Sequence, residues 1–197
     1  RLYRYSQLPD YRSFRVSVPV VRDFGRMVKL ALALNMAVKL EFGQPEPELM
    51  EEVLDQANLF LHQPSVSQPV EFFYSVFMGF YHEYPVSLWA IQQEDSYSNR
   101  FVTEEGSEAI SKRLIGAVPK GYLSGFGEEF RHGLLSEGAE CLNCPFAQIC
   151  LGYFKWPSTS YHCDGGVKVL FRTLQEAALE LKQDLSSFSS SNEKGEP

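Results

Sequence analysis

Residues 37–61, AVKLEFGQPEPELMEEVLDQANLFL, are the stretch that most clearly decides the fold. The apolar run 37–42 is typical of a short strand, and it ends at Gly43. Pro45 and Pro47 then lead into an acidic first turn, which suits the positive end of a helix dipole. Apolar residues follow at helical spacing, and they are Leu49, Val53, Leu54, Ala57, Phe60 and Leu61. The stretch therefore predicts a strand followed by an amphipathic helix.

The segment before it predicts a second pair of this kind. Residues 13–21, SFRVSVPVV, alternate Phe14, Val16 and Val18 with polar positions, as a half-buried strand does, until Pro19 interrupts the pattern. Asp23 then opens a helical pattern that runs to about residue 34, where Asn35 is a plausible stop. Strands and helices thus alternate over the first third of the chain.

The rest of the chain reads as mainly helical. Residues 70–82 are apolar on almost every side, which is typical of a buried or interface helix that Pro85 ends. Residues 86–92 start another short element, 104–116 predict an exposed amphipathic helix, and 167–185 predict a long one. Pro119 and the glycines at 121, 125 and 127 mark a boundary, and the tail SSFSSSNEKGEP predicts disorder.

These patterns predict an α+β fold that is mainly helical. Its expected parts are an N-terminal helical, peptide-docking domain (1–119) with a few short strands, a cysteine-rich C-terminal lobe that includes the last helix (120–186), and a disordered tail (187–197).

Composition narrows the classes of partner. The net charge of −7 argues against general nucleic-acid binding, which needs clustered Lys and Arg. The N-terminal 30 residues are nevertheless basic, which suits an acidic peptide or acidic partner surface, although simply solvated arginines explain the pattern as well. No apolar stretch reaches the ~18 residues of a membrane span and no secretory signal is visible, so we expect a cytoplasmic protein without a membrane partner.

All four cysteines fall within residues 141–163, with the spacing C-x2-C-x5-C-x12-C: Cys141, Cys144, Cys150 and Cys163. Four thiolates suit an iron–sulfur cluster or zinc, and two local disulfides would clip the same segment. His162 could replace one ligand. The rest of the chain shows no nucleophile elbow, H-E-x-x-H, phosphate loop or dinucleotide-binding glycine pattern, so the sequence predicts no catalytic residue.

The run CLNCPFAQIC resembles the core of the SPASM auxiliary-cluster domains of peptide maturases, which implies an iron–sulfur or zinc protein acting in electron transfer or peptide maturation. The segment PVEFFYSVFMGFYHEYPVSLW, the cysteine block and GYFKWP at 152–157 resemble the MbnC family of accessory proteins in methanobactin biosynthesis. That resemblance implies a heterodimer with MbnB, a barrel-fold iron oxygenase. By the same resemblance, the partner subunit would hold a multinuclear iron site and convert cysteines of a ribosomally made precursor peptide into oxazolone and thioamide.

Two sets of binding residues follow. The first set surrounds the predicted strand, whose edge would accept an extended precursor peptide, and it comprises Arg12, Phe14, Arg15, Val16 and Val18. Pairing of this strand inside its own domain is an equal alternative. The second set would meet the partner subunit, and it comprises Phe154, Trp156 and Tyr161. We expect the cysteines to brace the loop that carries these rings, so that Cys144→Ser would damage folding or assembly first.

Overall fold

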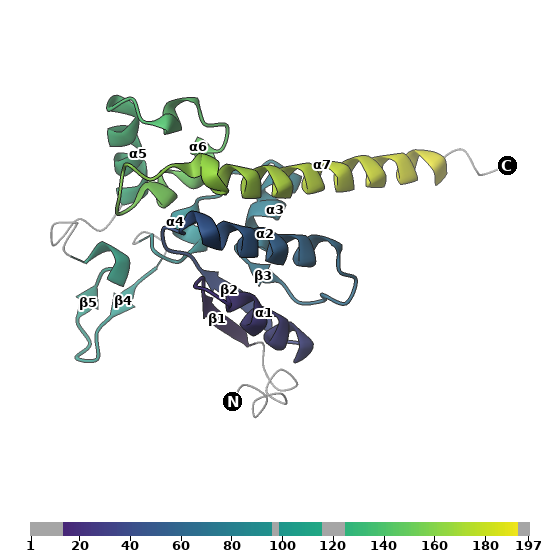
Figure 1. Ribbon diagram of the computed structural model, residues 1–197, viewed down its shortest axis with the longest axis horizontal. Helices are drawn as coiled ribbons and strands as arrows, with labels where there is room; N and C mark the ends of the chain where they lie inside the picture. The colour runs from purple at the N-terminus through teal and green to yellow at the C-terminus, as the bar shows by residue number, and fades with distance from the viewer. Residues whose placement is uncertain (1–13, 96–98, 116–124, 193–197) are drawn as a thin grey trace. The chain divides into compact units, whose positions relative to one another are not determined.

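A three-stranded parallel sheet organises the N-terminal part of the chain (Figure 1). The computed structural model describes residues 14–95, 99–115 and 125–192. The strands β1 (Arg15–Pro19), β2 (Ala37–Glu41) and β3 (Val70–Glu71) lie in the order of the sequence. Arg15 pairs with Ala37, and Val38 pairs with Val70. Helices α1 (Phe24–Ala33) and α2 (Pro47–His62) supply the crossovers that parallel strands require. Both predicted strand–helix pairs are therefore confirmed.

The two faces of this sheet differ sharply in character. Four even-numbered strand residues, Val18, Val38, Leu40 and Val70, are buried with exposed fractions of 0–1%, and Val16 on the same face is half-buried. Successive side chains point to opposite faces, so the odd positions share the other face. Most of that face is polar: Arg15, Ser17, Lys39, Glu41 and Glu71. Parallel sheets are usually covered and apolar on both faces, which makes this polar face distinctive.

Helix α1 begins against α2. The carboxylate of Glu52 accepts hydrogen bonds from the amide N–H groups of Asp23 (3.0 Å) and Gly25 (2.9 Å), two of the donors that a helix start leaves unpaired. Gly25 allows this approach, because a Cβ there would lie 2.7 Å from Nε2 of Gln56. Glu52, from the acidic segment that begins α2, thus also stabilises the start of the neighbouring helix α1.

Two further helices complete the same body. Helices α3 (Phe73–His82) and α7 (Val167–Asn192) pack on each other, and the rings of Phe72 and Phe171 lie 6.4 Å apart. Gly166 precedes α7 with φ of 143°, and a Cβ there would lie 2.5 Å from Cβ of Met50. This contact requires glycine where the chain enters α7. The helix predicted over residues 70–82 begins later in the structure, because Val70 and Glu71 form β3 and α3 begins at Phe73.

The middle of the chain forms a second body of short elements. They are α4 (Leu88–Ile91), the antiparallel strands β4 (Phe101–Val102) and β5 (Glu108–Ala109), α5 (Phe126–Ser136) and α6 (Ala147–Cys150). Short 3₁₀ helices link them: η3 (Lys112–Leu114), η4 (Glu140–Asn143) and η5 (Tyr153–Lys155), while η6 (Cys163–Gly165) precedes α7 in the first body.

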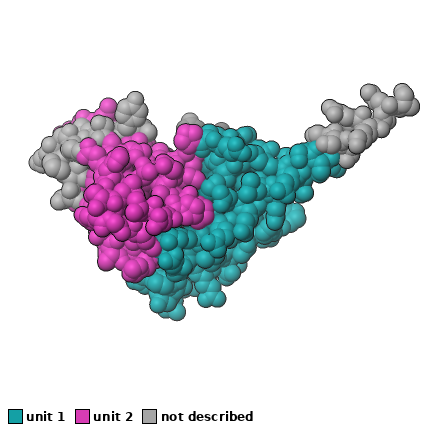
Figure 2. Space-filling model, turned by 90° about the horizontal axis from the view of Figure 1, so that it is seen from above, with its two compact units in different colours: residues 1–41, 45–84, 163–197 teal, residues 42–44, 85–162 magenta. Residues whose placement is uncertain are grey.

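The two bodies do not follow the predicted domain boundaries. Unit 1 comprises the chain up to Glu41, Pro45–Tyr84 and the chain from Cys163 onward, and unit 2 comprises Phe42–Gln44 and Pro85–His162 (Figure 2). The last helix therefore belongs with the N-terminal sheet, because its apolar side packs on α3 and α2. The fold is α+β and mainly helical, as the sequence predicts.

Two local predictions are wrong. In the described part of this segment, residues 104–115 form a hairpin and η3 instead of a helix, because Gly106 adopts φ of 81° and Thr103 N–H donates to Ser107 O across the turn. The tail predicted to be disordered from 187 is helical to Asn192, and residues 193–197 lie outside the described part. No helix in the described ranges is long and apolar enough to cross a membrane.

Candidate functional site

Strand β1 borders the parallel sheet and presents an edge of backbone groups. The amide N–H of Val20 donates to Glu41 O (3.0 Å), and that of Val38 donates to Pro69 O (3.0 Å). Backbone groups alternate between the two sides of a strand, so Val16 and Val18 direct theirs toward β2. The N–H and C=O groups of Arg15 and Ser17 then face the outer edge. Among the described residues, no strand pairs with that edge.

Pro19 follows the same alternation. It lies on the outer side of β1, where its missing N–H interrupts no bond to β2. Pro19, which interrupts the strand pattern in the sequence, is thus compatible with an edge strand. The outer edge is short. Within β1 it offers two backbone donors, the amide N–H of Arg15 and that of Ser17.

Several basic side chains of β1, of α1 and of the turn between them are exposed. The side chain of Arg15 is 42% exposed and lies 3.7 Å from the Glu71 carboxylate. Arg22, Arg26 and Lys29 are exposed in and before α1. Phe14 is 38% exposed, Val16 is half-buried and Val18 is buried in the core. Arg12, the remaining predicted peptide-binding residue, lies outside the described residues.

The four cysteines are all free thiols, so none of the predicted local disulfides is present. Cys141, Cys144 and Cys150 lie in unit 2, whereas Cys163 lies in unit 1. Cys144 is half-buried and the other three are buried. In the described chain, no three His, Cys, Asp or Glu side chains are placed to hold a metal ion together.

Cys150 has the most perturbed thiol of the block. Burial raises the pKa of Cys150 to about 12, and the thiolate charges of Cys141 and Cys144 raise it further within that value. Backbone N–H groups of Phe154 and Tyr153 donate to the Cys150 sulfur and lower the pKa in part. The three cysteines of unit 2 thus lie within electrostatic range of one another. At neutral pH Cys150 is a neutral thiol and not a nucleophile.

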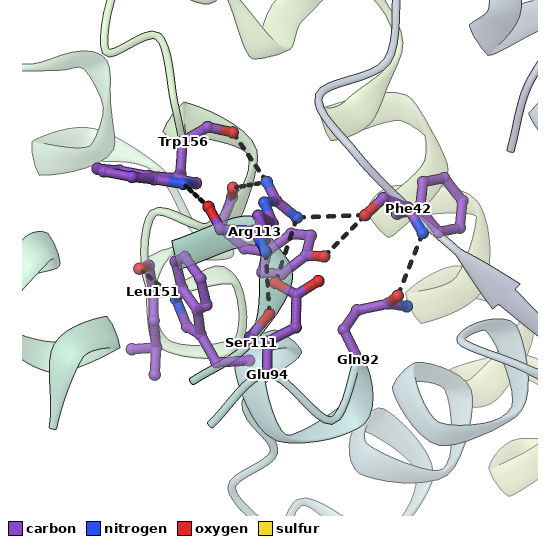
Figure 3. Close-up of polar contacts among 9 residues, drawn as sticks. Phe42, Gln92, Glu94, Ser111, Arg113, Leu151 and Trp156 are labelled. Atoms are coloured by element: carbon purple, nitrogen blue, oxygen red, sulfur yellow. Dashed lines mark hydrogen bonds and ion pairs between the residues drawn. The ribbon is translucent and has the colours of Figure 1, made fainter. Parts of the chain in front are cut away.

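One half-buried arginine, Arg113, holds the segment after Cys150 (Figure 3). The guanidinium of Arg113 donates to the backbone oxygens of Phe42 (3.2 Å), Tyr153 (2.9 Å) and Trp156 (2.8 Å). It lies 3.7 Å from the Glu94 carboxylate, with the two side chains only 13% and 17% exposed. Its Cζ also sits 3.9 Å from the centroid of the Tyr153 ring. Arg113 therefore joins four segments of unit 2 that are distant in sequence.

Aromatic rings surround this arginine. The Tyr153 hydroxyl donates to Phe42 O (2.8 Å), and the Trp89 indole donates to Leu151 O (3.1 Å). The Trp89 and Tyr153 centroids lie 4.9 Å apart in a T-shaped contact. Burial raises the pKa of Tyr153 far above its usual range, partly offset by the Arg113 charge. The hydroxyl thus acts as a hydrogen-bond donor throughout the physiological range.

A buried lysine ties the cysteine block to the same segment. Lys155 is 3% exposed, and its ammonium lies 2.7 Å from the Glu140 carboxylate and donates to Tyr161 O. Glu140 directly precedes Cys141, so this pair links η4 to η5. An ion pair and the Arg113 network perform the bracing that the sequence suggested for the cysteines.

The predicted partner-interface residues are largely used inside unit 2. Phe154 is fully buried and meets Phe42 edge-on at 5.9 Å. Trp156 is half-buried, lies 5.2 Å from Phe126, and donates from its indole to Arg113 O (3.1 Å). Tyr161 is half-buried. Of the three rings, Phe154 offers no surface to a partner, since internal packing covers it.

No family model, curated protein or solved structure matches the chain.

Proposed function

We propose that the chain is a non-catalytic subunit of a peptide-modifying complex and that β1 binds the precursor peptide as an added strand. In this proposal the partner is an MbnB-like, barrel-fold iron oxygenase that holds the iron and converts a peptide cysteine to oxazolone and thioamide. The complex would be cytoplasmic, which agrees with the free thiols of all four cysteines.

The outer edge of β1 is the observation that carries this proposal. Strand addition needs unpaired backbone groups on a border strand, and the N–H and C=O groups of Arg15 and Ser17 supply them. The exposed charges of Arg22, Arg26 and Lys29 would attract acidic side chains of the peptide. Main-chain bonds would give affinity, and these charges would favour an acidic leader.

One substitution tests the edge directly. Ser17→Pro removes an outward N–H without removing a bond to β2, and Ser17→Ala is its matched control, because both lose the hydroxyl that donates to Glu41. The probe is a fluorescein-labelled acidic leader-type peptide with alternating Val and Glu, measured by anisotropy. We expect Ser17→Pro to weaken binding about five- to tenfold relative to Ser17→Ala, the value of one main-chain hydrogen bond.

The result that contradicts the proposal is equal binding by the two variants. A peptide N-methylated on the residues that face β1 provides the reciprocal test and should bind as weakly to the wild-type chain. Co-purification with an MbnB-like oxygenase tests the second half of the proposal separately.

A second candidate function rests on the cysteines: a SPASM-like cysteine-rich lobe that holds an iron–sulfur cluster or zinc and acts in electron transfer or peptide maturation. Its supporting observation is that Cys141 and Cys144 act electrostatically on Cys150, whose sulfur accepts two backbone N–H groups, as metal-bound thiolates commonly do. Assembly of a ligand shell requires a rearrangement of these side chains. Anaerobic purification with iron, sulfide and zinc analysis tests it, and a metal-free protein that still binds its partners would exclude it.

A further inference from the structure

Helix α7 carries one apolar stripe along its whole described length. The members alternate in spacing between four and three residues: Val167, Phe171, Leu174, Ala178, Leu181, Leu185 and Phe188. The first four are 0–2% exposed in the core of unit 1. The last three are 40%, 49% and 73% exposed, in order along the helix. The apolar stripe thus continues beyond the segment of α7 that packs on α2 and α3. It extends into the part of the helix that projects past these two helices (Figure 1).

A groove adjoins the start of this exposed segment. It lies between α2, α3 and α7, has a volume of about 340 Å³, and is lined by Phe60, Leu61, Phe77 and Leu181. Two carboxylates on α7, Glu180 and Asp184, border it, and both are exposed. The groove and the stripe share Leu181, so they form one continuous apolar surface with an acidic rim.

We propose that this surface binds an amphipathic helix of a partner protein whose apolar stripe is flanked by Lys or Arg. A spacing of four and three residues is the repeat by which one helix packs along another, and an extended peptide does not present it. The carboxylates of Glu180 and Asp184 would pair with the basic flank. A second copy of this chain is a poorer occupant, since it would bring the same carboxylates to the interface.

The surface is separate from the outer edge of β1. No residue of β1 lines the groove, and Ser17 is not among the residues that a bound helix would contact. The inference therefore stands or falls independently of the proposed recruitment of a precursor peptide.

Three synthetic peptides of 21 residues serve as probes in the experiment, each labelled and titrated with the full chain. The first peptide has Leu at both heptad core positions and Lys at the flanking positions. The second replaces Lys with Glu, and the third scrambles the first to remove the repeat. We expect the first peptide to bind at least tenfold more tightly than either control.

Exposed positions provide variants that leave the fold intact. Leu181→Gln and Phe188→Ser should each weaken binding of the first peptide about tenfold, because each removes an apolar contact at the centre or end of the stripe. Glu180→Lys combined with Asp184→Lys should reverse the preference between the first two peptides. Val169→Ser is the matched control, since Val169 is 42% exposed on α7 but lies outside the stripe.

Several results would overturn the inference. They are equal binding of the Lys and Glu peptides, equal binding by Phe188→Ser and Val169→Ser, or no binding of the first peptide at 100 µM. Sedimentation velocity tests whether a second copy of the chain occupies this surface instead. A wild-type dimer that Phe188→Ser converts to a monomer would show that a second copy, not a basic helix, covers the surface.

Discussion

Arg113→Met would remove the guanidinium that joins the segments of unit 2 while keeping most of the aliphatic volume. Phe42 O would retain the Tyr153 hydroxyl as a donor at 2.8 Å, so the loss falls mainly on the backbone oxygens of Tyr153 and Trp156. The Glu94 carboxylate, 17% exposed, would lose the cation that lies 3.7 Å away. Breaking a buried ion pair and its hydrogen bonds costs about 3–5 kcal/mol, a large part of a typical domain's stability.

Tryptophan fluorescence measures this loss selectively, because the chain's two tryptophans, Trp89 and Trp156, both lie in unit 2. The Trp89 ring centroid is 5.7 Å from Cζ of Arg113, and the Trp156 indole donates to Arg113 O. In a urea titration with a slope of about 2 kcal/mol per molar, the midpoint should fall by roughly 2 M.

Arg100→Met is the matched control for this variant. Arg100 pairs with Glu108 at 2.7 Å in the same unit, but the side chains are 68% and 51% exposed. Exposed pairs contribute about 0–1 kcal/mol, so the midpoint should hardly move. Adding Glu94→Gln to Arg113→Met should restore part of the stability, because it removes the negative charge whose nearby cation has been lost. Equal midpoints for Arg113→Met and Arg100→Met would refute the assignment of Arg113 as the organising residue of unit 2.

Three further outcomes can be measured on the same protein. Gly127→Ala in α5 should lower the free energy of unfolding by about 1–3 kcal/mol, because its Cβ would lie 2.5 Å from Cδ1 of Trp89. Gly133→Ala, where the Cβ would meet open space, should raise the free energy of unfolding by up to about 1 kcal/mol. In the metal-free chain at pH 8, alkylation by iodoacetamide followed by peptide mapping should label half-buried Cys144 well before buried Cys150. The raised pKa of Cys150 should also make stability fall as pH rises from about 9 toward 12, because the unfolded thiol ionises first, and Cys150→Ala should flatten this part of the pH–stability curve.

The regular part of unit 1 was predictable from local patterns. Alternation over 14–18 and helical spacing over 47–62 each report which side of an element is buried, and the sheet and α2 follow them. Strand β3 escaped prediction because it is only two residues long and is followed almost directly by the apolar residues that begin α3. The helical end of α7 also escaped, because Ser186 and Ser187 hydroxyls donate to the helix carbonyls of Gln183 and Asp184 instead of favouring disorder.

Most of unit 2 could not be predicted, because its contacts join residues far apart in the chain. Arg113 reads in sequence as one charge of an amphipathic helix, yet its partners lie at positions 42, 94, 153 and 156. The spacing of the cysteines predicts that all four act as one unit. It gave no sign that Cys163 would fall in unit 1.

The insertion of unit 2 between α3 and α7 imposes an order on synthesis at the ribosome. Helix α3 packs mainly on α7, so Val76 of α3 and the neighbouring Phe72 and Phe73 become fully buried only after α7 has been synthesised. The whole of unit 2 is translated in between, which takes several seconds at about 5–20 residues per second. During that interval α2 and α3 expose the apolar surface that α7 later covers.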